Sequence, residues 1–200
     1  MSRNDRRIYT RSDRWPAVYG GRADDLGFDY YQESEFMKLS QALIEVARKE
    51  IGVTEVNGSN CGPRVDEYKA STWLNPKVGW PWCAAFVCWC VREAMALSGV
   101  KETKTFKRPR TAGAWDFENW SLAQDDSTNT KKPHRNDIQP GDIVIFTFSH
   151  IGIATSAPDK NGNVRTCEGN TDGAGSREGG AVLAKTRHVS RIRSRIRFMV

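Results

Sequence analysis

A cysteine at position 83 stands where a thiol could act as a nucleophile. It follows the stretch Gly79-Trp80-Pro81-Trp82 and opens an apolar run that continues to Arg92. Proline has a fixed φ and no N–H group, which suits the start of a helix. We therefore expect Cys83 in the first turn of a buried helix, where free backbone N–H groups and the helix dipole favour an anion. A thiol held there should ionise more readily than a free one, although many buried cysteines only fill space.

Acyl transfer by a thiol needs a base and a group that orients the base. Of the three histidines in the chain, His150 opens a strand-like segment. The other two are expected in solvent, at His134 and His188. Side chains alternate along a strand, so Glu168 and Asn170 are expected on one face of the segment that follows. These three residues are the predicted partners of Cys83, although a core histidine and ordinary strand-end polar residues would explain each of them singly.

The pattern of apolar residues places helices before strands. The helix that opens at Cys83 should run to Leu97, with Gly99 as its stop. Other helices are expected at 36–51, 65–71 and 111–120. The remainder of 101–135 is expected to be loop, including a hydrophilic stretch at 125–135. Short β-rich segments separated by turn residues follow at 143–148, 150–156, 163–168, 181–186 and 194–199. This order predicts an α+β fold with an antiparallel sheet packed against the Cys83 helix.

Length and charge narrow the class of protein. A chain of 200 residues suggests one domain, expected at 36–200, with an N-terminal extension of unknown role at 1–35. The net charge of +6 favours anionic polymers, but the chain shows no nucleic-acid motif, so no nucleic-acid partner is expected. Neither a secretory signal nor a membrane-spanning run is apparent. We expect a protein that is made in the cytoplasm without a signal peptide and does not insert into membranes.

The five cysteines do not form a metal-binding pattern. Their number is odd, and no C-x2-C spacing occurs among Cys61, Cys83, Cys88, Cys90 and Cys167. We expect reduced thiols and no zinc, and structural roles for all of them except Cys83.

Four segments, in this order, resemble the CHAP domain, the cysteine- and histidine-dependent amidohydrolase/peptidase group of the papain-like superfamily. They are Trp80-Pro81-Trp82-Cys83-Ala84-Ala85-Phe86-Val87, Gly141-Asp142-Ile143-Val144, Ser149-His150-Ile151-Gly152-Ile153 and Glu168-Gly169-Asn170-Thr171. Each segment alone is weak evidence for the family, but the four in this order are specific for it. The resemblance spans roughly 36–200. It implies a papain-like fold in which N-terminal helices, including a central helix that carries the cysteine, pack on the antiparallel sheet.

The resemblance also implies roles for the polar residues. Cys83 would be the nucleophile, and His150 the general base and later the acid. Glu168 would orient the imidazole, and Asn170 matches the family's fourth polar position, as orienter or oxyanion partner. The backbone N–H of Cys83 would help to hold the oxyanion. The substrate groove has four candidate lining residues, for which packing or local salt bridges is the alternative: Trp80, Trp82, Asp66 and Arg64.

Some members of the family carry calcium on an acidic loop. The corresponding stretch here, 57–66, has a single acid, Asp66, so we expect no metal and no cofactor.

The implied function is hydrolysis of peptidoglycan amide bonds, by an N-acetylmuramoyl-L-alanine amidase or a cysteine endopeptidase. We expect a monomer whose partner is bacterial peptidoglycan. A phage endolysin, a virion-associated lysin or a delivered antibacterial effector would fit a basic chain that lyses the cell wall after release. Two alternatives stay open: a papain-like amidase acting on a small thiol conjugate, and a catalytically idle phage or wall-binding structural protein.

Overall fold

The structure is a computed structural model that describes residues 37–200. The expected extension at 1–35 lies outside the described residues. The helices are α1 (Leu39–Lys49), α2 (Pro63–Lys69), α3 (Cys83–Ser98) and α4 (Asp116–Leu122). The strands are β1 (Thr128–Lys131), β2 (Ile143–Phe146), β3 (Ile151–Ala154), β4 (Asn163–Thr171), β5 (Ala181–His188) and β6 (Ile192–Phe198), with a 3-10 turn at Val189–Arg191. The prediction of an α+β fold is confirmed.

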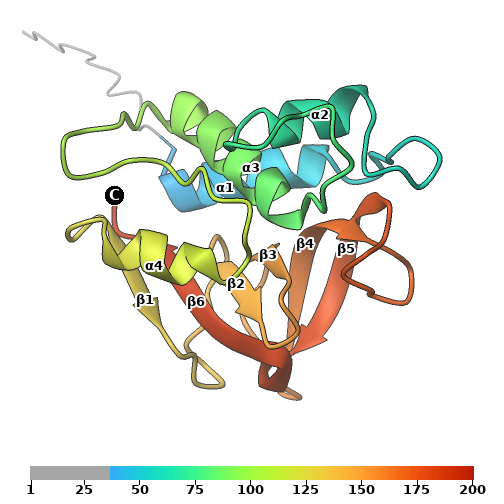
Figure 1. Cartoon of the computed structure of the whole chain (residues 1–200). Coiled ribbons are helices and arrows are strands. Elements are labelled where there is room, and N and C mark those ends of the chain that lie inside the picture. The colour runs from blue at the N-terminus through green and yellow to red at the C-terminus, as the bar shows by residue number, and fades with distance from the viewer. Residues whose placement is uncertain (1–36) are drawn as a thin grey trace, which may run out of the picture. The chain divides into compact units, whose positions relative to one another are not determined.

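The helices α1 and α3 form one layer of the domain (Figure 1). Helix α1 buries one apolar face, which includes Leu39, Leu43 and Val46, as its 3.6-residue periodicity predicts. Helix α3 is buried over most of its circumference and ends at Gly99, whose φ of 73° is the left-handed value that favours glycine at a helix end. No helix within 37–200 is long and apolar enough to cross a membrane.

The second layer is a six-stranded antiparallel sheet in the order β1-β6-β2-β3-β4-β5. Its strands lie below α1 and α3 in the view of Figure 1. Ile143 and Ile145 of β2 belong to the core shared with the helices, whereas Val144 and Phe146 belong to a second cluster on the other face. The alternation of side chains thus gives the sheet two buried faces.

One strand was not expected from the sequence. Residues 128–131 lie within the stretch predicted to be a hydrophilic loop, but they form β1 and pair with β6. The segment Thr-Asn-Thr-Lys lies at the edge of the sheet, and its side chains are only half-buried or exposed. For this reason its sequence does not alternate between apolar and polar residues. Its strand structure depends on pairing with β6, a contact between distant parts of the chain that local sequence does not encode.

The close approach of β4 to α3 allows a prediction about the stability of the fold. A Cβ on Gly169 would lie 2.7 Å from the Phe86 side chain and 2.9 Å from Trp82, so Gly169→Ala overpacks this contact. We expect Gly169→Ala to lower the free energy of unfolding by about 1–3 kcal/mol in chemical denaturation. Gly173→Ala is the matched control, because a Cβ there meets no atom within 4 Å. Equal stability of the two variants would contradict this packing.

Candidate active site

Cys83 is the first residue of α3 and is 8% exposed. The residue before it, Trp82, is fully buried, stacks on Tyr68 at 5.6 Å between ring centroids, and donates from Nε1 to Glu55 at 3.0 Å. These contacts fix the chain where the helix begins. No side chain caps this helix end, so the first backbone N–H groups have no side-chain acceptor. The thiol therefore sits where the helix can stabilise a negative charge.

His150 and Glu168 form a fully buried pair. The imidazole Nε2 lies 3.1 Å from Glu168 Oε2, and both side chains have no solvent exposure. A carboxylate accepts hydrogen bonds, so this contact assigns a proton to Nε2. The other ring nitrogen, Nδ1, is buried and has no hydrogen-bond partner among residues 37–200. The Cys83 thiol is among the groups that raise the pKa of His150.

The two members of the pair shift each other's ionisation in opposite directions. Burial lowers the pKa of His150, but interactions with Cys83 and Glu168 outweigh it and raise that pKa to about 9. Burial raises the pKa of Glu168, but hydrogen bonds from Arg187 and His150 outweigh it and lower that pKa to about 2. At neutral pH the site thus favours a carboxylate beside an imidazolium.

Arg187 on β5 is a part of this site that sequence reasoning missed. Its Nε donates to Glu168 Oε1 at 2.9 Å, and its Nη2 also donates to that carboxylate. The guanidinium carbon lies 5.3 Å from each ring centroid of Phe146 and Phe148, and both rings stack on His150. No local pattern distinguishes Arg187 from its arginine neighbours in the sequence, so only the strand pairing could have identified it.

Asn170 lies apart from this hydrogen-bond network. Pairing of β4 with β5 is irregular between Glu168 and Thr171, and Asn170 has a left-handed φ of 56°. The strand alternation that placed Asn170 on the face of Glu168 is therefore interrupted there. The amide Nδ2 donates to the Arg177 carbonyl at 3.3 Å, while Oδ1 is buried without a partner within 37–200. Its predicted role as orienter or oxyanion partner stays a prediction.

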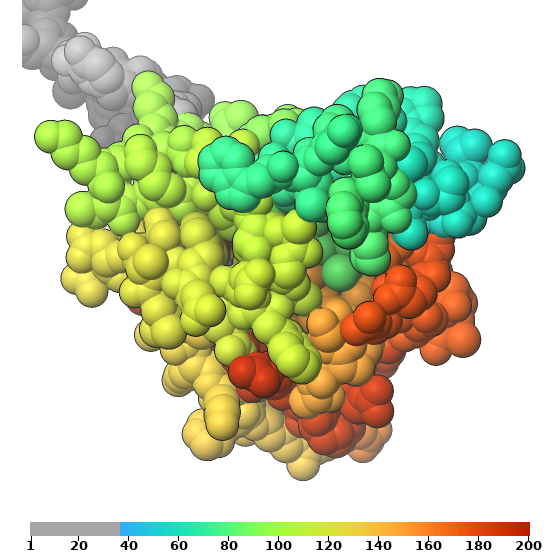
Figure 2. All heavy atoms as spheres, in the orientation of Figure 1, coloured from blue at the N-terminus to red at the C-terminus, as the bar shows by residue number. Residues whose placement is uncertain are grey.

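A cleft of about 180 Å³ opens beside Cys83. Its walls come from four parts of the chain, and the lining residues are Pro81, Cys83, Ala112, Gly113, Ala114, Ser149, Arg177 and Glu178. Figure 2 shows this face, on which the segment before α3 (green), the loop before α4 (yellow-green) and the β4–β5 region (orange) meet. Apart from Cys83, the sequence did not single out these residues as cleft residues, although Pro81 and Ser149 lie within segments that resemble the CHAP domain.

The two aromatic residues predicted to line the substrate groove, Trp80 and Trp82, do not line the cleft. Trp82 is fully buried and seats α3, which fits the packing alternative. Its predicted contact with substrate stays a prediction. Trp80 is 48% exposed but does not line the cleft.

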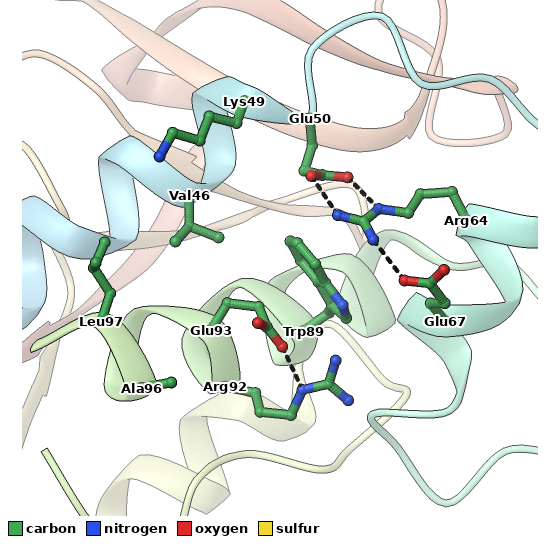
Figure 3. A pocket seen from close by; sticks show the side chains of 10 residues that line it. All are labelled: Val46, Lys49, Glu50, Arg64, Glu67, Trp89, Arg92, Glu93, Ala96 and Leu97. Atoms are coloured by element: carbon green, nitrogen blue, oxygen red, sulfur yellow. Dashed lines mark hydrogen bonds and ion pairs between the residues drawn. The ribbon is translucent and has the colours of Figure 1, made fainter. Parts of the chain in front are cut away.

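The two charged candidates are engaged elsewhere. Arg64 is bound by Glu50 through two hydrogen bonds of 2.7 Å and stacks on Trp89 at 4.3 Å. Figure 3 shows it in a different pocket, which shares no lining residue with the Cys83 cleft. Asp66 pairs with Lys77 at 2.9 Å and lies 3.4 Å from Lys69. The ion pairs of Arg64 and Asp66 fit the alternative of local salt bridges, and the groove role of these two residues stays a prediction.

The charge coupling of His150 and Glu168 is directly measurable. We expect an NMR titration to give His150 a pKa of about 9 in the wild type. Loss of the carboxylate charge destabilises the imidazolium, so Glu168→Gln should lower this pKa by about one unit or more. The exposed His134 supplies a reference signal in the same spectra. A His150 titration that is identical in both proteins would contradict the coupling.

Comparison with known proteins agrees with this geometry. No curated protein matches the chain. A family model for the CHAP domain matches residues 75–170, the stretch that contains Cys83, His150 and Glu168. The match supports a hydrolase of the amidase/peptidase class. The match confirms the resemblance to the CHAP domain that the sequence motifs indicated.

Proposed function

We propose that this protein hydrolyses amide bonds of bacterial peptidoglycan in a papain-like site, through an acyl-enzyme formed on Cys83. The observation that carries the proposal is the buried His150–Glu168 pair beside a thiol at the start of α3. These parts supply a nucleophile, a proton carrier and an orienting carboxylate, which are the parts that covalent acyl transfer needs.

In the acylation half, His150 holds the proton of the thiol, and the Cys83 sulfur attacks the carbonyl carbon of the scissile amide. A carbon–sulfur bond forms, and the carbonyl electrons move to oxygen. Backbone N–H groups at the start of α3 would donate to this oxyanion. As the tetrahedral intermediate collapses, the carbon–nitrogen bond breaks and His150 gives its proton to the leaving amine.

In the deacylation half, His150 takes a proton from a water molecule that attacks the thioester carbonyl. The carbon–sulfur bond then breaks, releasing a carboxylic acid and the Cys83 sulfur, which shares the proton with His150. Glu168 stays ionised throughout, because its role is to hold the imidazole and stabilise its positive form. The net reaction converts one amide and one water molecule into one amine and one carboxylic acid, and it needs no cofactor.

The setting of this chemistry is also a proposal. The net charge of +6 favours approach to anionic wall polymers. An N-acetylmuramoyl-L-alanine amidase and a peptide endopeptidase would use the same residues and differ in the substrate bound by the cleft. Release by a phage as a lysin, or delivery as an antibacterial effector, would bring the protein to the wall.

Digestion of purified peptidoglycan tests the function. We expect wild-type protein to release soluble fragments with new amine ends, identified by mass spectrometry, and the position of the cut to separate amidase from endopeptidase. Cys83→Ala should reduce the rate by about a thousandfold or more, because the acyl-enzyme cannot form.

The half-buried Cys61 gives a matched control, and Cys61→Ser should retain activity because this thiol lies outside the cleft. Full activity of Cys83→Ala would exclude the mechanism. The absence of any wall product from wild-type protein would instead favour the small thiol conjugate or an idle structural protein.

A further inference from the structure

The catalytic carboxylate is connected to the loop that borders the cleft. This loop, residues 172–180, joins β4 to β5 and includes the cleft residues Arg177 and Glu178. Arg187 of β5 reaches both features: its fork binds Glu168, and its Nη2 also donates to the Gly175 carbonyl at 3.1 Å. A single guanidinium thus spans the site and its border.

The contact with the loop is close. Gly175 has a left-handed φ of 84°, and a Cβ there would lie 2.7 Å from Arg187 Nη1. The guanidinium therefore packs directly on the Gly175 backbone. Lys185 adds hydrogen bonds to the carbonyls of Asp172 and Gly173, at 3.0 and 2.7 Å, so β5 holds the start of the loop at several points.

The carboxylate contact is equally constrained. Glu168 receives hydrogen bonds from Arg187, His150 and Thr166 and has no solvent exposure. The titratable or charged groups that act on Glu168 are His150 before β3 and Arg187 on β5, while Cys83 of α3 acts on the imidazole. The neighbouring Cys167 thiol has a pKa raised to about 12 by burial and by Glu168, so it stays neutral. Arg187 is therefore the permanent positive charge in contact with Glu168.

We propose that Arg187 is a positioning residue with two tasks: it keeps Glu168 ionised and aimed at His150, and it holds loop 172–180 in the shape that forms one wall of the Cys83 cleft. The proposal rests on the proposed function for its second task, which concerns substrate. The first task concerns the protein alone. Arg187 acts through Glu168 and the loop and does not contact the reacting atoms.

The two tasks make separate predictions. Arg187→Met leaves a buried carboxylate without its cation, which raises the pKa of Glu168. Protonation of Glu168 then weakens the imidazolium, so the acid limb of the pH–rate profile should move up by about one pH unit or more. Arg187→Lys keeps a positive charge but loses the planar fork that spans Glu168 and Gly175. Its acid limb should stay near that of the wild type, while KM for peptidoglycan rises severalfold.

The experiment measures two rates across pH: alkylation of Cys83 by iodoacetamide, which needs no wall substrate, and release of peptidoglycan fragments. Arg193→Met is the matched control, because Arg193 on the adjacent part of the chain pairs with Glu118 at the surface, outside the cleft. Circular dichroism confirms that each variant is folded. If Arg187→Met does not fold, the double variant Arg187→Met/Glu168→Gln removes both charges and leaves none unpaired, and its alkylation should be as slow as that of Glu168→Gln alone.

A shifted acid limb for alkylation in Arg187→Met, with the Lys variant near the wild type, supports the first task even if no protein cleaves peptidoglycan. That result would separate failure of the proposed function from failure of this inference. An acid limb of Arg187→Met that coincides with those of wild type and Arg193→Met would overturn the first task. A double variant that alkylates faster than Glu168→Gln would also overturn it. Unchanged KM in Arg187→Lys would overturn the second task.

Discussion

The site depends on a carboxylate that is held ionised away from water. Glu168 is fully buried, and burial alone would favour its neutral form. Hydrogen bonds from Arg187, Thr166 and His150 reverse that preference and lower its pKa to about 2. Because the carboxylate is charged, the imidazole beside it retains a proton at neutral pH. The surrounding elements supply this pair with rigid support.

The rest of the fold explains how these groups meet. Trp82 is fixed by Tyr68 and Glu55, which sets the position at which α3 begins and hence the position of the thiol. Gly152 leaves room for the carboxylate, because a Cβ there would lie 2.7 Å from Glu168 Cγ. The rings of Phe146 and Phe148 stack on His150 and fix its plane. Helix, sheet and site are thus parts of one packed arrangement, and the site is preorganised before substrate binds.

Local sequence predicted the parts of this arrangement that follow a period or a stop signal. Helix α3 begins at Cys83 and ends before Gly99 because an apolar run is bounded by proline and glycine. The Cys167 thiol donates a hydrogen bond to the Ala47 carbonyl, on the helix side of the sheet. Glu168 points to the opposite face, toward His150, as strand alternation predicts. The motif order around Cys83, His150 and Glu168 indicated the resemblance to the CHAP domain, and the family-model match over residues 75–170 confirms this resemblance.

Long-range contacts account for what the sequence did not reveal. Arg187 reaches Glu168 only because β5 pairs with β4, and the polar edge strand β1 exists only beside β6. The irregular pairing after Glu168 turns Asn170 into a left-handed conformation that no periodic pattern indicates. For Trp82 and Arg64 the residue type suggested a substrate contact, whereas the burial of Trp82 and the Glu50 ion pair of Arg64 are contacts within the protein that local sequence does not reveal.

The central claim is that the buried Glu168 charge activates Cys83 through His150. Its most direct test is the rate at which iodoacetamide alkylates Cys83 at pH 6, followed by mass spectrometry, in the wild type and in Glu168→Gln. The account predicts that the variant reacts at least about tenfold more slowly. A His150 pKa that is lower by one unit makes the imidazolium about tenfold less favourable, and with it the ion pair that activates the thiol. Equal alkylation rates in two folded proteins would contradict it.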